Sequence, residues 1–250
     1  MTLAAFPTRY ALLIPAFNEA QSIDRVLEQI PSGLFSQVIV VDNGSEDGTA
    51  EVARAGGAWV VREPRRGYGR ACLAGLDQLH PETAAVAFMD ADLSDDPGDL
   101  ARIVQLFDEG RWDLVLGSRV LGNPQPGSLT PLQRFGNSMS TLLIRWLWHM
   151  PFTDLGPMRM VSRRALDALR LQDPDFGWNV EMQAKAARLG MRVREIPVSY
   201  RRRASGRSKV SGTLVGSVRA GLKIVWTIYR CWRIKLDREE AVPSSAARKV

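Results

Sequence analysis

The sequence from residue 85 to residue 97 is Ala85-Val86-Ala87-Phe88-Met89-Asp90-Ala91-Asp92-Leu93-Ser94-Asp95-Asp96-Pro97. It begins as a short apolar run, which is typical of a buried strand in a parallel sheet. Asp90 and Asp92 are two residues apart, a spacing that directs both side chains of extended backbone to the same side. Two carboxylates there are costly without a cation, and their oxygens suit Mg²⁺ or Mn²⁺. The stretch predicts a divalent-cation site at Asp90 and Asp92.

The two later acids of this stretch have a simpler interpretation. Asp95 and Asp96 stand just before Pro97, and acidic residues and proline are both favoured where a helix begins. We therefore expect both carboxylates to serve the start of the next helix rather than the cation.

Apolar runs and helical periodicity alternate along the chain. Strands are expected over residues 10–15, 38–41, 58–61, 85–89, 114–116 and 193–200. Helices are expected between the first five strands, and later over about 133–150, from about 162, from about 177 and over 213–236. This alternation predicts an α/β fold with a mostly parallel, doubly wound sheet and helices on both faces. Ligands bind such sheets at the carboxyl ends of the strands, where Asp42, Asp90, Asp92 and Arg119 should converge.

Composition excludes several kinds of site. Cys72 and Cys231 are the only cysteines and form no motif, so neither a disulfide framework nor a thiolate zinc site is expected. With only His80 and His149, a histidine metal centre or a Ser-His-Asp triad would be hard to assemble. Residues 1–9 lack the features of a signal peptide, so the cytoplasm is the expected location.

Charge is divided unevenly along the chain. The first 125 residues contain 10 Lys/Arg and 18 Asp/Glu, whereas the remaining 125 contain 23 and 9. This division favours a divalent cation in the first half and an anionic partner for the second. The glycines at Gly67 and Gly69 raise the possibility of a dinucleotide site, but Cys72 replaces the third glycine and the loop is not the first strand–helix turn. A Rossmann oxidoreductase is therefore disfavoured.

The C-terminal region is basic and amphipathic. A run of cations over 201–209 precedes the helix expected over 213–236, whose uncharged runs are too short to span a bilayer. Such a helix can lie in a membrane interface or pack on the domain, and the sequence leaves both open. Residues 237–250 are expected to be a flexible tail.

At this point the pattern resembles family 2 of the inverting nucleotide-sugar glycosyltransferases, which have the GT-A fold. The matching segments run in family order over nearly the whole chain: 14–19, 40–49, 67–75, 89–93 and 117–119. Within the family, Asp90-Ala91-Asp92-Leu93 and Gly206-Arg207-Ser208-Lys209 make the chain look most like the dolichyl- or polyprenyl-phosphate sugar synthases. The resemblance implies a GT-A domain over 1–212, with a nucleotide-sugar half (1–120) and an acceptor half (121–212).

The resemblance also implies roles for individual residues. Those expected to bind the nucleotide sugar are Pro15, Ala16, Asn18, Glu19, Asp42, Gly67, Asp90, Ala91 and Asp92. Asp90 and Asp92 would hold Mg²⁺ or Mn²⁺, which offsets the charge that develops on the departing nucleoside diphosphate. Those expected to bind a polyprenyl-phosphate or other lipid acceptor are Arg119, Arg134, Ser138, Arg202 and Lys209. Asp90, Asp92, Arg119 and Glu181 are the catalytic candidates.

The chain departs from the family pattern at a few positions. Asn43 stands where many relatives have a second Asp, and Ser94 where the lipid-phosphate enzymes often have Gln. The segment 154–159 differs from the corresponding Asp-Pro-x-Ser-Gly pattern, and we interpret it as a subgroup mark that lines the acceptor site. Among Arg201, Arg202 and Arg203, the acceptor contact is assigned only to within one residue.

Three functions are open at this stage. The first is transfer of a sugar from a UDP- or GDP-sugar to a polyprenyl phosphate on the inner face of a membrane, which needs no general base because a phosphate oxyanion is already a nucleophile. The second is transfer to a hydroxyl, with Glu181 as the base that the hydroxyl requires. The third is a non-catalytic module that binds an anionic surface. No nucleic-acid partner is expected.

Overall fold

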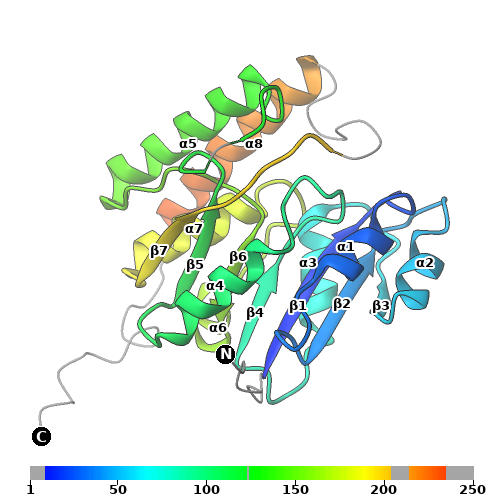
Figure 1. Cartoon of the computed structure of the whole chain (residues 1–250). Coiled ribbons are helices and arrows are strands. Elements are labelled where there is room, and N and C mark those ends of the chain that lie inside the picture. Colours follow the sequence, from blue (N-terminus) through cyan, green and yellow to red (C-terminus); the bar gives the residue numbers. More distant parts are fainter. Residues whose placement is uncertain (1–8, 123, 204–213, 235–250) are drawn as a thin grey trace, which may run out of the picture.

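The computed structural model describes residues 9–122, 124–203 and 214–234. Seven strands form one sheet in the order β3-β2-β1-β4-β6-β5-β7 (Figure 1). The strands are β1 (Tyr10–Ala16), β2 (Gln37–Asp42), β3 (Trp59–Arg62), β4 (Ala85–Phe88), β5 (Leu114–Ser118), β6 (Arg159–Ser162) and β7 (Val193–Pro197). Only β6 runs antiparallel to its neighbours, β4 and β5, in this described sheet. The predicted mostly parallel α/β fold is therefore confirmed.

Helices cover both faces of the sheet. The first set, on one face, comprises α1 (Ile23–Gln29), α2 (Thr49–Ala55) and α4 (Asp99–Asp108). The second set, on the other face, comprises α3 (Tyr68–Leu76), α5 (Pro131–Trp148), α6 (Arg163–Leu169), α7 (Trp178–Leu189) and α8 (Leu214–Arg233). Successive strand residues alternate between the two faces, so Leu12 and Ile14 join the core under the first set while Leu13 joins the core under the second. The buried strands are thus apolar on both faces, as a parallel sheet requires.

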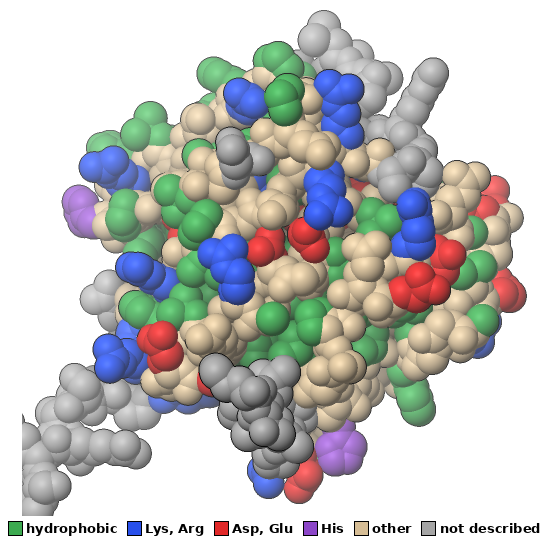
Figure 2. Space-filling model, in the orientation of Figure 1, with side chains coloured by type: hydrophobic (Ala, Val, Ile, Leu, Met, Phe, Trp, Pro, Cys, Tyr) green, Lys and Arg blue, Asp and Glu red, His purple; other side chains and the backbone are tan. Residues whose placement is uncertain are grey.

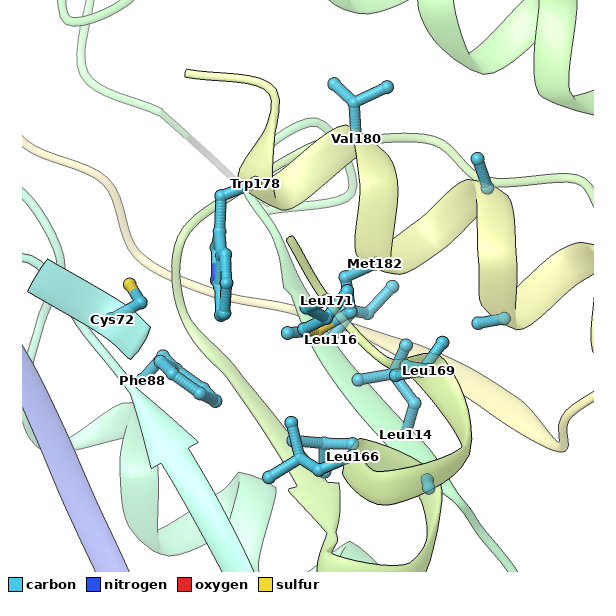
Figure 3. Packing of buried hydrophobic residues seen from close by; sticks show 14 of the residues in the cluster. Cys72, Phe88, Leu114, Leu116, Leu166, Leu169, Leu171, Trp178, Val180 and Met182 are labelled. Atoms are coloured by element: carbon cyan, nitrogen blue, oxygen red, sulfur yellow. The ribbon is translucent and has the colours of Figure 1, made fainter. Parts of the chain in front are cut away.

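The core between the sheet and the second set of helices is built around aromatic side chains. Phe88 at the end of β4 lies against the fully buried Trp178 of α7, with ring centroids 6.4 Å apart (Figure 3). Leu114 and Leu116 of β5 extend the same cluster toward α6 and α7. This packing fixes the start of α7, and with it the preceding loop, beside the end of β4.

Two glycines at the start of α3 allow that loop to approach closely. A Cβ added at Gly69 would lie 1.9 Å from the carbonyl oxygen of Asp173, and one at Gly67 would lie 2.3 Å from that of Pro174. The Arg70 amide also donates to the Pro174 carbonyl at 3.0 Å. The Gly67-Tyr68-Gly69 segment thus serves contact between two backbone segments, which only a residue without a side chain allows.

Helix α8 packs along α7 and beside α5. Its buried side carries cations that meet acids of the domain: Lys223 pairs with Asp173 at 3.1 Å, and Arg230 pairs with Glu181 at 3.2 Å. Of the helix expected over 213–236, Leu214–Arg233 is helical as α8, and one side of it packs on the domain. The tail over 237–250 and Lys209 lie outside the described residues.

One strand was not predicted. Residues 159–162 form β6, which inserts between β4 and β5, whereas the sequence analysis assigned them no structure before a helix near residue 162. That helix is confirmed as α6, with the Ser162 hydroxyl accepting the Ala165 amide at its start.

Candidate active site

A cavity of about 380 Å³ opens where β1 and β4 end. Seven of the nine residues predicted to bind a nucleotide sugar line it: Pro15, Ala16, Glu19, Gly67, Asp90, Ala91 and Asp92. They come from three segments far apart in the sequence. Strand β1 lies between β2 and β4, and these parallel neighbours end at the same edge of the sheet, which brings the segments together. A cavity at the carboxyl ends of parallel strands is the usual ligand position in such a sheet.

The other two predicted residues organise the loops behind the cavity. An Asp42 carboxylate oxygen accepts the Ser45 amide at 2.9 Å, and the Asn18 side-chain oxygen accepts the Glu46 amide at 2.9 Å. Neither residue lines the cavity, whereas Asn43 does. Their placement favours a positioning role over direct contact with a ligand.

Asn43 explains the departure from the family pattern. Its amide nitrogen donates to the carbonyls of Glu63 (2.9 Å) and Arg65 (2.8 Å), and its oxygen accepts the Gly67 amide at 2.8 Å. An aspartate could not make the two donations. Asparagine at this position therefore joins the ends of β2 and β3 to the start of α3.

Asp90 and Asp92 meet in the cavity with the guanidinium of Arg203. The Arg203 Nε lies 2.8 Å from an Asp92 carboxylate oxygen, and its guanidinium lies 3.6 Å from Glu19. The other Asp92 oxygen accepts the Ser94 amide and hydroxyl at 2.9 and 2.5 Å. Burial, and then the charge of Asp92, raise the pKa of Asp90 to about 6. The oxygen Oδ1 of Asp90 is buried and has no hydrogen-bond partner among the described residues.

This pair suits a small divalent cation. A buried carboxylate oxygen without a donor, beside a carboxylate that already attracts a cation, offers two hard oxygen ligands. The described part of the chain contains no group of three or more His, Cys, Asp or Glu side chains that could hold a metal alone. Mg²⁺ commonly binds through one or two carboxylates and completes its coordination with substrate phosphates and water. The donor set fits that arrangement.

Asp95 does not cap a helix, and this expectation was wrong. The N-cap of α4 is Gly98, with no side-chain cap, and only Asp96 contacts it, accepting the Gly98 amide at 3.0 Å. Asp95 is 2 % exposed, and its backbone forms an isolated antiparallel β-bridge with Tyr200. Neither of its carboxylate oxygens has a hydrogen-bond partner in the described chain. Burial, with Asp90 and Asp92 nearby, raises the pKa of Asp95 well above its ordinary value.

Four of the five predicted acceptor residues are described, and they lie outside the cavity. Arg119, at the end of β5, forms a two-pronged ion pair with the buried Asp154, with both distances 2.8 Å. Arg134 and Ser138 are exposed on α5. Arg202 is exposed, and its Nε donates to the Pro126 carbonyl at 2.9 Å. The basic residue that does line the cavity from this segment is Arg203, one position further along.

The segment 154–159 is structural. Asp154 holds Arg119, and Arg159 is fully buried with carbonyl oxygens of Gly156 and Pro157 as partners. Burial lowers the pKa of Arg159 to about 10. Neither side chain lines the cavity, and the expectation that this segment lines an acceptor site stays a prediction.

Glu181 is placed as an anchor rather than a base. It is fully buried on α7, where one oxygen pairs with Lys185 at 2.9 Å and with Arg230 at 3.2 Å. The other oxygen accepts the amides of Gln172 and Asp173 at 3.0 and 2.6 Å. A carboxylate with both oxygens occupied, away from the cavity, has the surroundings of a group that holds α7, α8 and the 170–177 loop together.

Several cavity residues were not predicted individually. Arg66 stacks on Phe17, with the guanidinium carbon 3.6 Å from the ring centroid, and Tyr68 lines the cavity from α3. Asp175 and Phe176 come from the loop before α7. Arg66 and Tyr68 flank the glycine that the motif did indicate, so a local signal existed. Nothing local marks Asp175 and Phe176, because the contact of their loop with Gly67 and Gly69 is long-range.

The described helices include none that is long and apolar enough to cross a membrane. The acidic cavity at the carboxyl ends of the strands is the position where this kind of sheet binds a ligand.

The model of the family Glycosyl transferase family 2 matches residues 11–170, and the chain belongs to that family. It is 43 % identical, over 83 % of this chain and 92 % of the relative, to an uncharacterised glycosyltransferase of Mycobacterium tuberculosis. It is 29 % identical, over 87 % of this chain and 96 % of the relative, to the undecaprenyl-phosphate mannosyltransferase of Micrococcus luteus. Among solved structures, glucosyl-3-phosphoglycerate synthase of Mycobacterium tuberculosis, in complex with Mn²⁺, UDP and its product, has the same fold, with a TM-score of 0.72 at 22 % identity over 92 % of this chain and 81 % of that one.

Proposed function

We propose that this glycosyltransferase moves a sugar from a UDP- or GDP-sugar to a polyprenyl phosphate, with inversion and with the help of Mg²⁺ or Mn²⁺. The observation that carries the proposal is the cavity at the ends of β1 and β4, where the buried Asp90 and Asp92 face Arg203 and which Glu181 does not line. The similarity to the undecaprenyl-phosphate mannosyltransferase of Micrococcus luteus supports the lipid phosphate as acceptor.

In this proposal different cavity residues bind different parts of the donor. Asp90 and Asp92 hold the cation, which when bound neutralises charge on the diphosphate. Arg203 leaves Asp92 and pairs with a diphosphate oxygen, because a cation and a guanidinium compete for the same carboxylate. Pro15, Ala16, Glu19 and Gly67 surround the nucleoside. Asp175 and Phe176 supply a carboxylate and an aromatic face on the wall built by the α7 loop.

The transfer step needs little from the protein beyond orientation and charge. A phosphate oxygen of the acceptor attacks the anomeric carbon, its new bond forms as the bond from that carbon to the diphosphate oxygen breaks, and the nucleoside diphosphate leaves with the electron pair. No proton has to be removed from the acceptor, since its phosphate is anionic at neutral pH. Arg119, Arg134, Ser138, Arg202 and Lys209 remain the proposed acceptor contacts, on the inner face of a membrane.

The alternatives are weaker. Transfer to a hydroxyl with Glu181 as base would require that carboxylate to leave two ion pairs and two backbone amides. The hypothesis of a non-catalytic module is set aside by the family to which the chain belongs.

The test is a transfer assay with paired acceptors. The full chain is incubated with Mg²⁺ or Mn²⁺, labelled UDP- and GDP-sugars, and either undecaprenyl phosphate or the matching undecaprenol, which lacks only the phosphate. The proposal expects an organic-extractable labelled product with the phosphate alone, and no product with Asp92→Ala. A product with the alcohol, or with small phosphorylated acceptors only, would refute the lipid-phosphate assignment.

A further inference from the structure

Helix α5 exposes a stripe of large apolar side chains. Phe135, Leu142 and Trp146 are 66 %, 65 % and 74 % exposed, and Leu132 is 41 % exposed. Phe135, Leu142 and Trp146 are spaced by seven and four residues, so they share one side of the helix. The opposite side buries Ser140, Thr141 and Ile144. An outward apolar stripe of this size is unusual on a helix that already packs against a domain.

Helix α8, which lies beside α5, exposes a second stripe. Leu222, Val225, Trp226, Tyr229 and Trp232 are between 42 % and 68 % exposed. Trp226, Tyr229 and Trp232 form a row, with ring centroids 5.7 and 6.2 Å apart. The other side of α8 buries Thr227, Ile228 and Cys231. The two stripes together are named the α5–α8 face.

The charge of this face is of one sign. Neither α5 nor α8 contains an Asp or Glu. Arg134 and Arg145 are exposed on α5, whereas Lys223 and Arg230 of α8 are turned toward Asp173 and Glu181. Hydrophobic and basic side chains gather over α5 in Figure 2. Arg233 is also exposed on α8, so both helices offer cations to a partner.

We propose that the α5–α8 face binds the surface of an anionic phospholipid bilayer, with both helices lying in the interface. Aromatic side chains that are apolar at one end favour the headgroup level of a membrane, and arginines there attract anionic lipids. A second copy of the chain suits the face less well, since an isologous contact would bring arginines together without an acid from either helix.

This inference goes beyond the transfer chemistry, because it names the partner of a surface outside the cavity. It also bears on the acceptor. Arg134 and Ser138 are exposed on α5 itself, so docking of this helix would place two proposed phosphate contacts at headgroup level. Docking itself needs neither donor nor polyprenyl phosphate, so its failure and the failure of the proposed function are separate results.

Vesicle flotation of the full chain tests the inference without any substrate. Vesicles of phosphatidylcholine alone are compared with vesicles of phosphatidylcholine and phosphatidylglycerol. We expect flotation with the anionic vesicles, and weaker flotation as salt rises. Arg145→Glu should reduce partitioning roughly fivefold or more, since each basic side chain contributes about that factor at an anionic surface. The double variant Phe135→Ser with Trp146→Ser should abolish it.

Trp59→Ser is the matched control, because Trp59 is 60 % exposed on β3, at the opposite edge of the sheet. This variant should float like the unmodified chain. Thermal unfolding of each variant checks that the fold is retained, which is expected because every changed side chain is exposed. No flotation of the unmodified chain, equal flotation of the Phe135/Trp146 double variant, or a dimer that this double variant alone breaks would overturn the proposal.

Discussion

Replacing Asp90 by asparagine should stabilise the metal-free protein while abolishing its activity. Burial, and then the charge of Asp92, raise the pKa of the Asp90 carboxyl to about 6 from its ordinary 3.8. Between these two pH values the folded chain binds a proton that the unfolded chain has lost. Stability therefore falls as pH rises through this interval, and the loss persists at higher pH. Asparagine has nearly the same shape and never ionises.

The size of the effect follows from the same values. A pKa difference of about two units corresponds to roughly 3 kcal/mol in the free energy of unfolding. Part of this gain is offset because the asparagine side chain stays buried where Oδ1 of Asp90 has no hydrogen-bond partner among the described residues, and an unpaired buried amide is costly. We expect Asp90→Asn to gain about 1 to 2 kcal/mol at about pH 8 and almost nothing at about pH 3, where the carboxyl is largely protonated in both states.

Urea unfolding in the presence of a chelator measures this prediction at both pH values. Asp77→Asn is the control, because Asp77 is exposed at the end of α3, and its effect should stay within about 0.5 kcal/mol. A loss of stability in Asp90→Asn at the higher pH, or an equal gain at both, would show that Asp90 is not held as a costly buried charge. The reasoning about the cation site would then lose its electrostatic basis.

Three further variants test other parts of the site. Arg203→Gln removes the 2.8 Å ion pair to Asp92, and calorimetry should show that Mn²⁺ binds the nucleotide-free protein about fivefold more tightly. Weaker binding would contradict the idea that Arg203 and the metal compete for Asp92. Gly69→Ala should cost about 3 kcal/mol in urea unfolding and weaken donor binding, while Gly136→Ala, with open space around it, should stabilise by up to about 1 kcal/mol. Glu181→Gln should cost about 3 kcal/mol in the free energy of unfolding and slow transfer less than about tenfold. A hundredfold slowing would support Glu181 as the general base.

The fold was predictable wherever the signal is local. Buried strands of a parallel sheet are continuous apolar runs, so β1, β2, β4 and β5 are visible in the sequence. Strand β6 is not, because it is four residues long and begins with Arg159, a charged residue that is nevertheless fully buried. Its antiparallel insertion between β4 and β5 depends on contacts distant in sequence.

The candidate site divides in the same way. Asp90 and Asp92 stand at a strand end, and a spacing of two fixes their common direction, so their meeting in the cavity was predictable. The role of Arg203 was not predicted: the sequence indicated an acceptor contact at Arg202, uncertain by one residue, whereas the turn of the segment after β7 brings Arg203 to Asp92 in the cavity. Asp95 was misassigned because its sequence position beside Pro97 resembles a helix start, whereas its burial results from the bridge to Tyr200.

The most direct measurement is calorimetric titration of the full chain with UDP and with GDP, each in the presence and absence of Mn²⁺, for the unmodified protein and for Asp92→Ala. The account predicts that one of the two nucleotides binds, that binding requires the metal, and that Asp92→Ala loses it while remaining folded. Equally tight binding without metal, or by folded Asp92→Ala, would contradict the claim that Asp90 and Asp92 hold a cation for the donor diphosphate.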